Sequence, residues 1–152
     1  MILGLFSVHS IAGASIYDMP SVAEATWHGA CLATAEMARR GLVQPSLLPQ
    51  LLDWLSKARV RASMGCRGLP FTKQALYFDI RKGAHSIGSN VRDAAAYVLW
   101  ALARAQHASS ISPHAVKLSQ SLVCVSLFDR DVSIRRAASA AFQEHVGRMV
   151  RR

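Results

Sequence analysis

Apolar positions in this chain recur every three or four residues, which is typical of helices with one buried face. The face predicted over residues 91–105 consists of Val91, Ala94, Ala95, Val98, Leu102 and Ala105. The face predicted over residues 134–145 consists of Ile134, Ala137, Ala138, Ala141, Phe142 and His145. The pattern therefore indicates amphipathic helices as the main building unit.

Start and stop signals divide the chain into five or six such helices. We expect helices over about residues 2–10, 22–40, 46–57 and 90–107, one that begins at Ser112-Pro113, and one that ends near Gly147. Ser21 or a neighbour is predicted to cap the second helix, with Glu24 in capping-box register, and Gly41 to end it. Asn90 is predicted to cap the fourth helix.

A short pattern of one large apolar residue followed by paired small residues occurs three times, at 27–31, 91–95 and 134–138. The second and third copies begin 43 residues apart, which is the spacing of HEAT and armadillo repeats. The predicted fold class is therefore all-α: an α-solenoid of HEAT/armadillo-type antiparallel helix pairs. Residues 1–152 would form about three repeats of it.

Residues 58–74 lack a helical face and contain Gly65, Gly68 and Pro70. The first two copies of the pattern begin 64 residues apart, and removing these 17 residues restores a spacing of 47. We expect 58–74 to be an irregular loop or disordered insertion, and residues 75–89 to be loop-like.

Four residues are predicted to cap helices and link neighbouring repeats. Asp131 at a helix entry would satisfy free N–H groups, and Arg135 one turn later could bind it or the next repeat's aspartate. Asn90 and Arg92 occupy the matching places in the preceding repeat. The interpretation we favour is a ladder of polar contacts along the solenoid, ahead of contact with a partner.

A second group of residues could contact a partner molecule. Tyr77 and Phe78 stand beside Arg81 and Lys82, so aromatic and basic groups occur together in a segment without helical pattern. Loops of this kind often carry binding residues.

The chain has 18 basic and nine acidic residues, a net charge of +9. That balance suits an acidic partner, whether nucleic acid, a membrane surface or an acidic protein. The alternative interpretation is that this is one part of a longer chain whose charge is balanced elsewhere. Nucleic acid is the less favoured partner, because aromatic residues are poorly interleaved and no groove-reading motif occurs.

No motif for catalysis, phosphate binding or metal binding is present, so we expect neither an enzyme nor a cofactor. The three cysteines indicate neither a disulfide framework nor a zinc site. Cys31 and Cys124 are predicted to be buried thiols in a reducing cytosol. The apolar run at residues 2–6 is too short to span a membrane and lacks the positive charge of a signal peptide.

Three stretches carry a more specific pattern. They are Trp27-His28-Gly29-Ala30-Cys31-Leu32-Ala33 with Arg39-Arg40-Gly41-Leu42; Gly88-Ser89-Asn90-Val91-Arg92-Asp93-Ala94-Ala95 with Tyr97, Trp100 and Ala103-Arg104-Ala105; and Phe128-Asp129-Arg130-Asp131 with Arg135-Arg136-Ala137-Ala138 and Val146-Gly147-Arg148. They cover most of residues 26–148 and resemble the tubulin-folding cofactor D family, also called tubulin-specific chaperone D.

The resemblance implies a piece from the central part of a long α-solenoid chaperone that captures β-tubulin and helps to join it to α-tubulin. Other tubulin-folding cofactors and an Arf-like small GTPase would be partners, and GTP hydrolysis would occur in tubulin's own site. The implied location is the cytoplasm, with association with the cytoskeleton or centrosome. Residues 58–74 are extra relative to the family pattern.

Two alternatives remain open at this point. One is a basic helical-repeat module that binds nucleic acid or another anionic surface. The other is a truncated product without function.

Overall fold

The computed structural model describes residues 20–56, 75–82 and 85–150. Within them the elements are α1 (Pro20–Arg39), η2 (Pro45–Leu47), α2 (Leu48–Ser56), η3 (Ala75–Tyr77), β1 (Ile80–Lys82), β2 (His85–Ile87), α3 (Ser89–Ala105), α4 (Ala108–Ile111), η4 (Ser112–His114), α5 (Ala115–Phe128) and α6 (Val132–Val150). The helix expected over residues 2–10 and the insertion expected over residues 58–74 lie outside the described residues.

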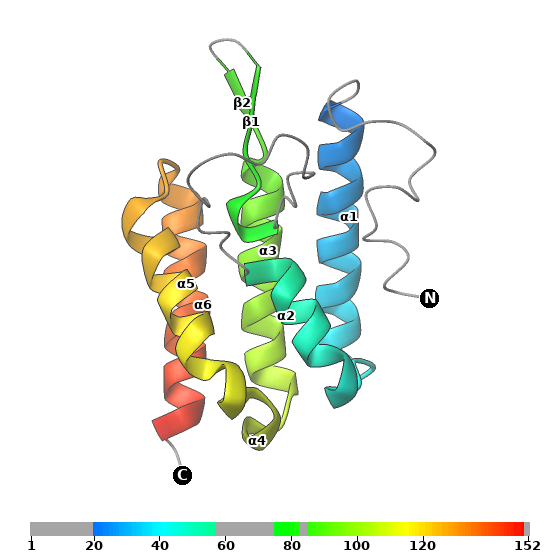
Figure 1. Ribbon diagram of the computed structural model, residues 1–152, viewed down its shortest axis with the longest axis vertical. Helices are drawn as coiled ribbons and strands as arrows, with labels where there is room; N and C mark the ends of the chain where they lie inside the picture. Colours follow the sequence, from blue (N-terminus) through cyan, green and yellow to red (C-terminus); the bar gives the residue numbers. More distant parts are fainter. Residues whose placement is uncertain (1–19, 57–74, 83–84, 151–152) are drawn as a thin grey trace, which may run out of the picture.

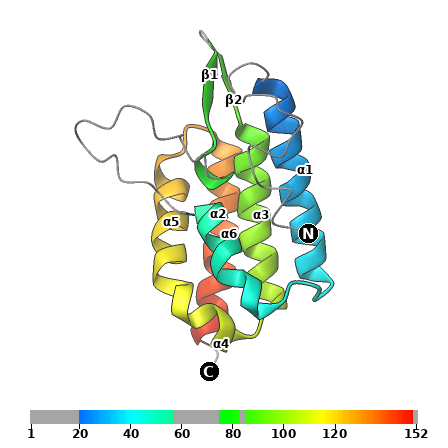
Figure 2. The ribbon, with the colours of Figure 1, turned by 45° about the vertical axis from the view of Figure 1, so that its right-hand side comes forward.

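The long helices form two layers (Figure 1). Helices α1, α3 and α6 run side by side in one direction, while α2 and α5 lie in front of them and run in the opposite direction (Figures 1 and 2). The chain therefore alternates between layers, which is the arrangement of an all-α solenoid. The predicted fold class is confirmed. The estimate of three repeats over residues 1–152 stays a prediction.

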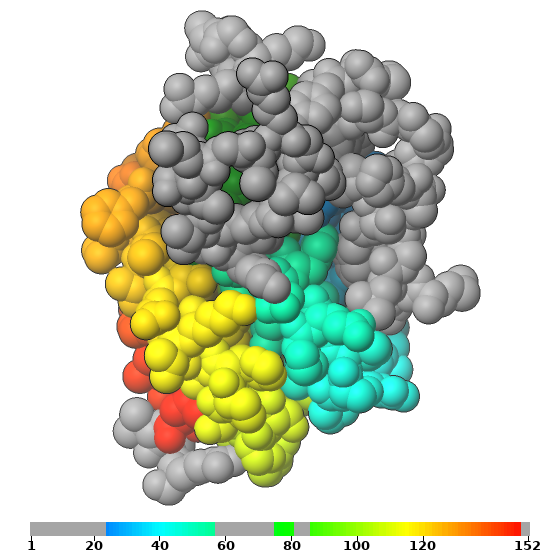
Figure 3. Space-filling view, in the orientation of Figure 1, coloured from blue at the N-terminus to red at the C-terminus, as the bar shows by residue number. Residues whose placement is uncertain are grey.

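The second layer is continuous at the surface as well. In Figure 3, α2 and α5 meet on the face toward the viewer. There Lys117 of α5 donates a hydrogen bond to the carboxylate of Asp53 in α2, with 2.7 Å between nitrogen and oxygen.

Helix α3 is the centre of the core, because it packs against α1 on one side and α6 on the other. Its buried residues include a run of small side chains that allow these close approaches: Ala94, Ala95, Ala96 and Ala101. The predicted inner face is correct except at Ala105, which is exposed in the last turn of the helix. On α6 the buried positions are Ile134, Ala138, Ala141 and His145.

The end of α1 follows the sequence prediction. Gly41 adopts a positive φ of 71°, and the N–H groups of Gly41 and Leu42 donate to the carbonyls of Ala38 and Met37. This pair of bonds is a Schellman motif, which satisfies carbonyls that the helix end leaves free.

Ser21 and Asn90 are not N-caps, and the residues before Pro20 that could cap α1 in place of Ser21 lie outside the described residues. Helix α1 already begins at Pro20, so Ser21 lies within its first turn, and Glu24 accepts a hydrogen bond from the N–H of Gly88 across the molecule. Asn90 lies inside α3 and is exposed, because that helix begins after Gly88. The Glu24 carboxylate binds the Gly88 N–H instead of its own helix end, and α3 begins directly after the turn at Gly88.

The expectation of a loop over residues 75–89 is also wrong. Strands β1 and β2 form an antiparallel hairpin in which Ile80 pairs with Ile87 and Lys82 with His85. The hairpin extends beyond one end of the helix layers (Figure 1). Strands of three residues are too short to leave a recognisable alternating pattern in the sequence.

An aromatic cluster joins this segment to the core. Trp27 of α1 stacks on Trp54 of α2 with 5.0 Å between ring centroids, and Phe78 lies 5.5 Å from Trp27 on a tilted plane. Cys31, one turn after Trp27, is completely buried, and burial raises the pKa of its thiol to about 12. Cys124 is exposed, so the prediction that it is buried is wrong.

Among the described residues, no helix is long and apolar enough to cross a membrane.

Candidate interaction site around Arg92

Arg92 is the buried charge at the centre of the site. It lies in the first turns of α3, and only 4% of its surface is exposed. Its guanidinium reaches four oxygen groups in two other segments of the chain. Buried charges persist in folded proteins when paired and hydrogen-bonded in this way.

The aspartates of the turn between α5 and α6 are its main partners. Nε of Arg92 donates to Oδ2 of Asp129, and Nη2 donates to Oδ2 of Asp131, both over 2.8 Å. Asp129 also accepts the backbone N–H of Asp131 through Oδ1, at 2.9 Å. Arg135 closes the turn by donating to the backbone carbonyls of Asp129 and Arg130.

The segment before the hairpin supplies the remaining contacts. Nη1 of Arg92 donates to the carbonyl of Phe78 at 2.9 Å and lies 3.9 Å from Oδ1 of Asp79. Arg130 donates to the same Asp79 oxygen at 3.0 Å, and Ser86 is hydrogen-bonded to both. Burial raises the pKa of Asp79, but the Ser86 hydrogen bond and the charges of Arg130 and Arg92 outweigh it. The pKa therefore lies below its usual value.

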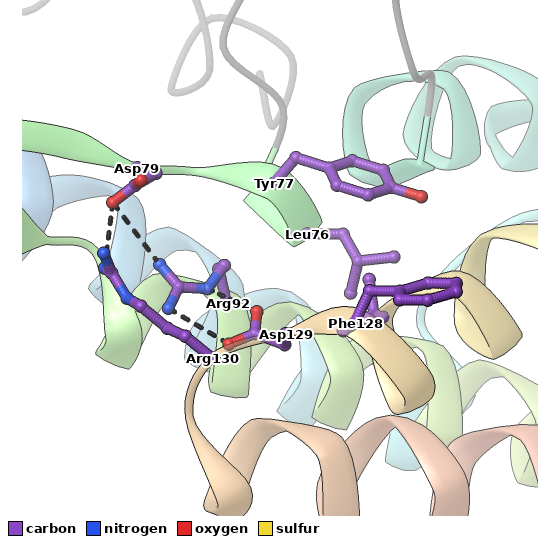
Figure 4. A pocket seen from close by; sticks show the side chains of 8 residues that line it. Leu76, Tyr77, Asp79, Arg92, Phe128, Asp129 and Arg130 are labelled. Carbon is purple, nitrogen blue, oxygen red and sulfur yellow. Dashed lines mark hydrogen bonds and ion pairs between the residues drawn. The ribbon is translucent and has the colours of Figure 1, made fainter.

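A cavity of about 330 Å³ opens beside this network (Figure 4). The charged residues form one wall, and the other wall is lined by Leu76, Tyr77, Val125 and Phe128. Phe128 is 81% exposed, whereas Tyr77 is 37% exposed and its hydroxyl donates to the carbonyl of Ser121. A cavity with one apolar and one ionic wall can bind a side chain or short segment of another protein.

Three of the four residues predicted to link repeats lie together here. Arg92 of α3 binds Asp131 ahead of α6, and Arg135 holds the turn that carries Asp131. Asn90 is exposed at the surface and is not among the residues of this network. The contacts thus connect one helix pair to the next.

The group predicted to contact a partner is divided by the fold. Phe78 is completely buried against Trp27, so its assignment as a contact residue is wrong. Tyr77 is partly exposed at the cavity, and Arg81 and Lys82 belong to strand β1. Phe78 is buried because the tight 3₁₀ turn before it directs its ring into the core.

Sequence reasoning missed Asp79, Asp129, Arg130 and Phe128 as members of the site. The pattern Asp129-x-Asp131 at a helix junction, one repeat after a buried-face arginine, was the available signal. Asp79 carried no local signal, because the two arginines that it contacts are 13 and 51 positions away along the chain.

The charged groups of this site pair with one another. Guanidinium groups occupy the space between the three aspartates, and the described residues include no cluster of side chains able to hold a metal ion. The residues that line the cavity include no cysteine, serine or histidine.

Two layers of alternating helices, with an arginine of one pair bound to the aspartates of the next, define a segment of an armadillo-type α-solenoid. A family model described as "Tubulin-specific chaperone D-like, ARM repeats" matches residues 14–151. The chain belongs to this family, and the resemblance drawn from the sequence is confirmed.

Two curated relatives match over 122 residues, or 80% of this chain. Tubulin-specific chaperone D of Dictyostelium discoideum is 51% identical, and tubulin-folding cofactor D of Schizosaccharomyces pombe is 30% identical. The chain spans 7% and 10% of their respective lengths. No solved structure matches it.

Proposed function

We propose that this chain is a non-catalytic binding segment of a tubulin-folding chaperone. The observation that carries the proposal is its 51% identity to tubulin-specific chaperone D of Dictyostelium discoideum over most of its length. In this function the chain contributes to the capture of β-tubulin and to the assembly of the α/β-tubulin heterodimer.

The structure supports a scaffold in two respects. The solenoid presents long, regular surfaces, and such surfaces are what repeat proteins use to bind other macromolecules. The Arg92 network fixes the geometry between neighbouring helix pairs, so a surface formed by several pairs keeps its shape.

The wider proposal includes the other partners of the family. Companion tubulin-folding cofactors and an Arf-like small GTPase would act together with this segment in the cytoplasm, near the cytoskeleton or centrosome. Hydrolysis of GTP would take place in tubulin, with the chaperone as an activator that contributes no reacting group.

A chimaera tests the proposal. The matching region of the Dictyostelium chaperone is replaced by this chain, and the yield of native α/β-tubulin heterodimer is measured in a refolding assay. We expect a yield within about twofold of the parent chaperone, whereas deletion of the region should abolish it. A folded chimaera that yields no heterodimer would contradict the proposal.

The net charge of +9 keeps nucleic acid as a second candidate partner. Binding of the isolated chain to duplex DNA and to tubulin, measured at the same salt concentration, separates the two. Tighter binding to DNA than to tubulin would favour the second candidate.

A further inference from the structure

Helix α3 has one narrow stripe that faces solvent. Its members are Asp93, Tyr97, Trp100 and Arg104, one turn apart from each other along the helix. Tyr97 and Trp100 are half-buried and stack with 5.8 Å between ring centroids and 18° between ring planes.

A charged cluster from α1 flanks the aromatic pair on one side. Glu36 accepts hydrogen bonds from Arg39 at 3.2 Å and from Arg40 at 2.9 Å. Arg39 also reaches the hydroxyl of Tyr97 at 3.4 Å. One carboxylate shared by two guanidinium groups leaves one positive charge uncompensated.

A second cluster of the same composition flanks the pair on the side of α6. Glu144 accepts a hydrogen bond from Arg148 at 3.0 Å and forms an ion pair with Arg104 at 3.8 Å. The guanidinium carbon of Arg104 lies 4.9 Å from the ring centroid of Trp100. Again one positive charge is in excess, and this arginine is held against an aromatic face.

The four arginines are about half exposed or more, with side-chain exposures of 47–69%. A guanidinium that already contacts one carboxylate or ring still has N–H groups free for a second, bidentate carboxylate. The stacked rings between the two clusters supply apolar contact area at little cost in conformational entropy.

The second cluster adjoins a cavity of about 400 Å³, and Arg148 belongs to both. The cavity is lined by Ala103, Gln106, His107, Ala108, Ile111, His145, Arg148 and Met149. His145 is 3% exposed, and neither ring nitrogen makes a hydrogen bond of normal geometry to the described residues. A buried imidazole therefore forms part of the wall of this cavity.

We infer that this surface, from Glu36 across Tyr97 and Trp100 to the cavity at His145, binds an acidic, extended segment of a partner polypeptide. The charges and the aromatic pair fix the chemistry of that segment: carboxylates at two separated positions, with an apolar side chain between them. The inference rests on the proposed function, since it specifies how the scaffold recognises a protein partner.

Nucleic acid fits this surface less well. The excess is one positive charge per cluster, and Glu36 and Glu144 each contact both arginines of their cluster, where they would repel phosphates. Separate carboxylates of a peptide can approach each arginine pair individually, whereas a continuous phosphate backbone would also pass close to these two glutamates.

Fluorescence anisotropy with synthetic peptides tests the inference. The probe is a short labelled peptide of alternating Glu and Ala with one central Leu, and the comparison peptide has Gln in place of every Glu. We expect the acidic peptide to bind the full chain at least about tenfold more tightly, with an affinity that falls as salt rises. Equal binding of the two peptides would overturn the inference.

Matched variants locate the site. Arg104→Gln removes a charge from the proposed surface, and Lys117→Gln removes one from the opposite layer; both side chains are 51% exposed. We expect about a tenfold loss of affinity for Arg104→Gln and for Trp100→Ala, and less than twofold for Lys117→Gln. Arg104→Lys should recover part of the loss.

Circular dichroism identifies variants that remain folded, and only these enter the comparison. Equal losses of peptide affinity for Arg104→Gln and Lys117→Gln would show that the peptide responds only to the net charge of the chain, and would overturn the inference. A duplex DNA that displaces the peptide at lower concentration than unlabelled peptide does would overturn it in favour of nucleic acid. Because no tubulin is present, a negative result here is distinct from a negative result with the chimaera.

Discussion

At the scale of single residues, Gly88 shows how contact with one neighbouring residue can require glycine at a position. Its φ is +129°, a region that residues with a Cβ rarely adopt. An added Cβ would overlap the backbone of Phe78 and lie 2.7 Å from its ring carbon Cδ1. The N–H of Gly88 also donates to Glu24, so the turn is held from both sides.

We predict that Gly88→Ala lowers the free energy of unfolding by about 2 kcal/mol or more, because it adds backbone strain and a steric clash. Gly29→Ala is the matched control. Gly29 lies inside α1 with open space around its would-be Cβ, so alanine there should raise stability by up to about 1 kcal/mol. Urea denaturation measures both, and equal effects of the two substitutions would contradict the account.

Residue-level prediction from the sequence succeeded where the cause is local. Gly41 was predicted to end a helix, and it does so through a left-handed C-terminal turn. Gly88 gave no comparable signal, because the contact that requires glycine comes from Phe78, ten positions earlier in the chain.

At the scale of elements, Arg92 joins α3 to the turn between α5 and α6 and to the segment before the hairpin. Its removal would leave the buried Asp129 carboxylate and the Phe78 carbonyl without their partner. An unpaired buried charge is costly in a way that the loss of a surface ion pair is not.

We therefore predict that Arg92→Met lowers the free energy of unfolding by about 3–5 kcal/mol, as measured by denaturant titration. Lys117→Met breaks an ion pair between exposed side chains and should cost at most about 1 kcal/mol. A loss for Arg92→Met no larger than that for Lys117→Met would mean that the network does not hold the helix pairs together.

The positions of the long helices could be predicted from the sequence, whereas the structure of the segments that join them could be predicted less well. The period of apolar residues in α3 and α6 predicted their faces, since periodicity is a local property. The hairpin of β1 and β2 was not predicted, because its three-residue strands show no period and are held by contacts such as that of Arg130 with Asp79.

At the scale of the whole molecule, the stability of the chain should depend on pH through His145. Burial lowers the pKa of this imidazole from its usual value near 6.5, although the Leu99 carbonyl and the charge of Glu144 partly oppose the shift. Between the folded pKa and about 6.5 the unfolded chain binds more protons than the folded chain. In that window stability rises with pH.

The contribution of neutral His145 is thus fully present above pH 6.5 and is lost as pH falls through the folded pKa. We predict that His145→Leu flattens the pH dependence of the free energy of unfolding by up to about 1.4 kcal/mol per pH unit within this window. Urea denaturation at pH values on both sides of 6.5 measures it. Parallel curves for the two proteins would contradict the prediction.

The sequence by itself determined the helical class, the alternating layers and the family, because apolar period, small-residue pairs and motif spacing are local features of the chain. The tertiary structure decided which charges meet and which surfaces stay open. Arg92 meets Asp129 from 37 positions away, and Glu24 meets Gly88 from 64. Those pairings, like the exposed stripe of α3 and the burial of Phe78, arise from how helices pack, and packing depends on all neighbours of a residue in space.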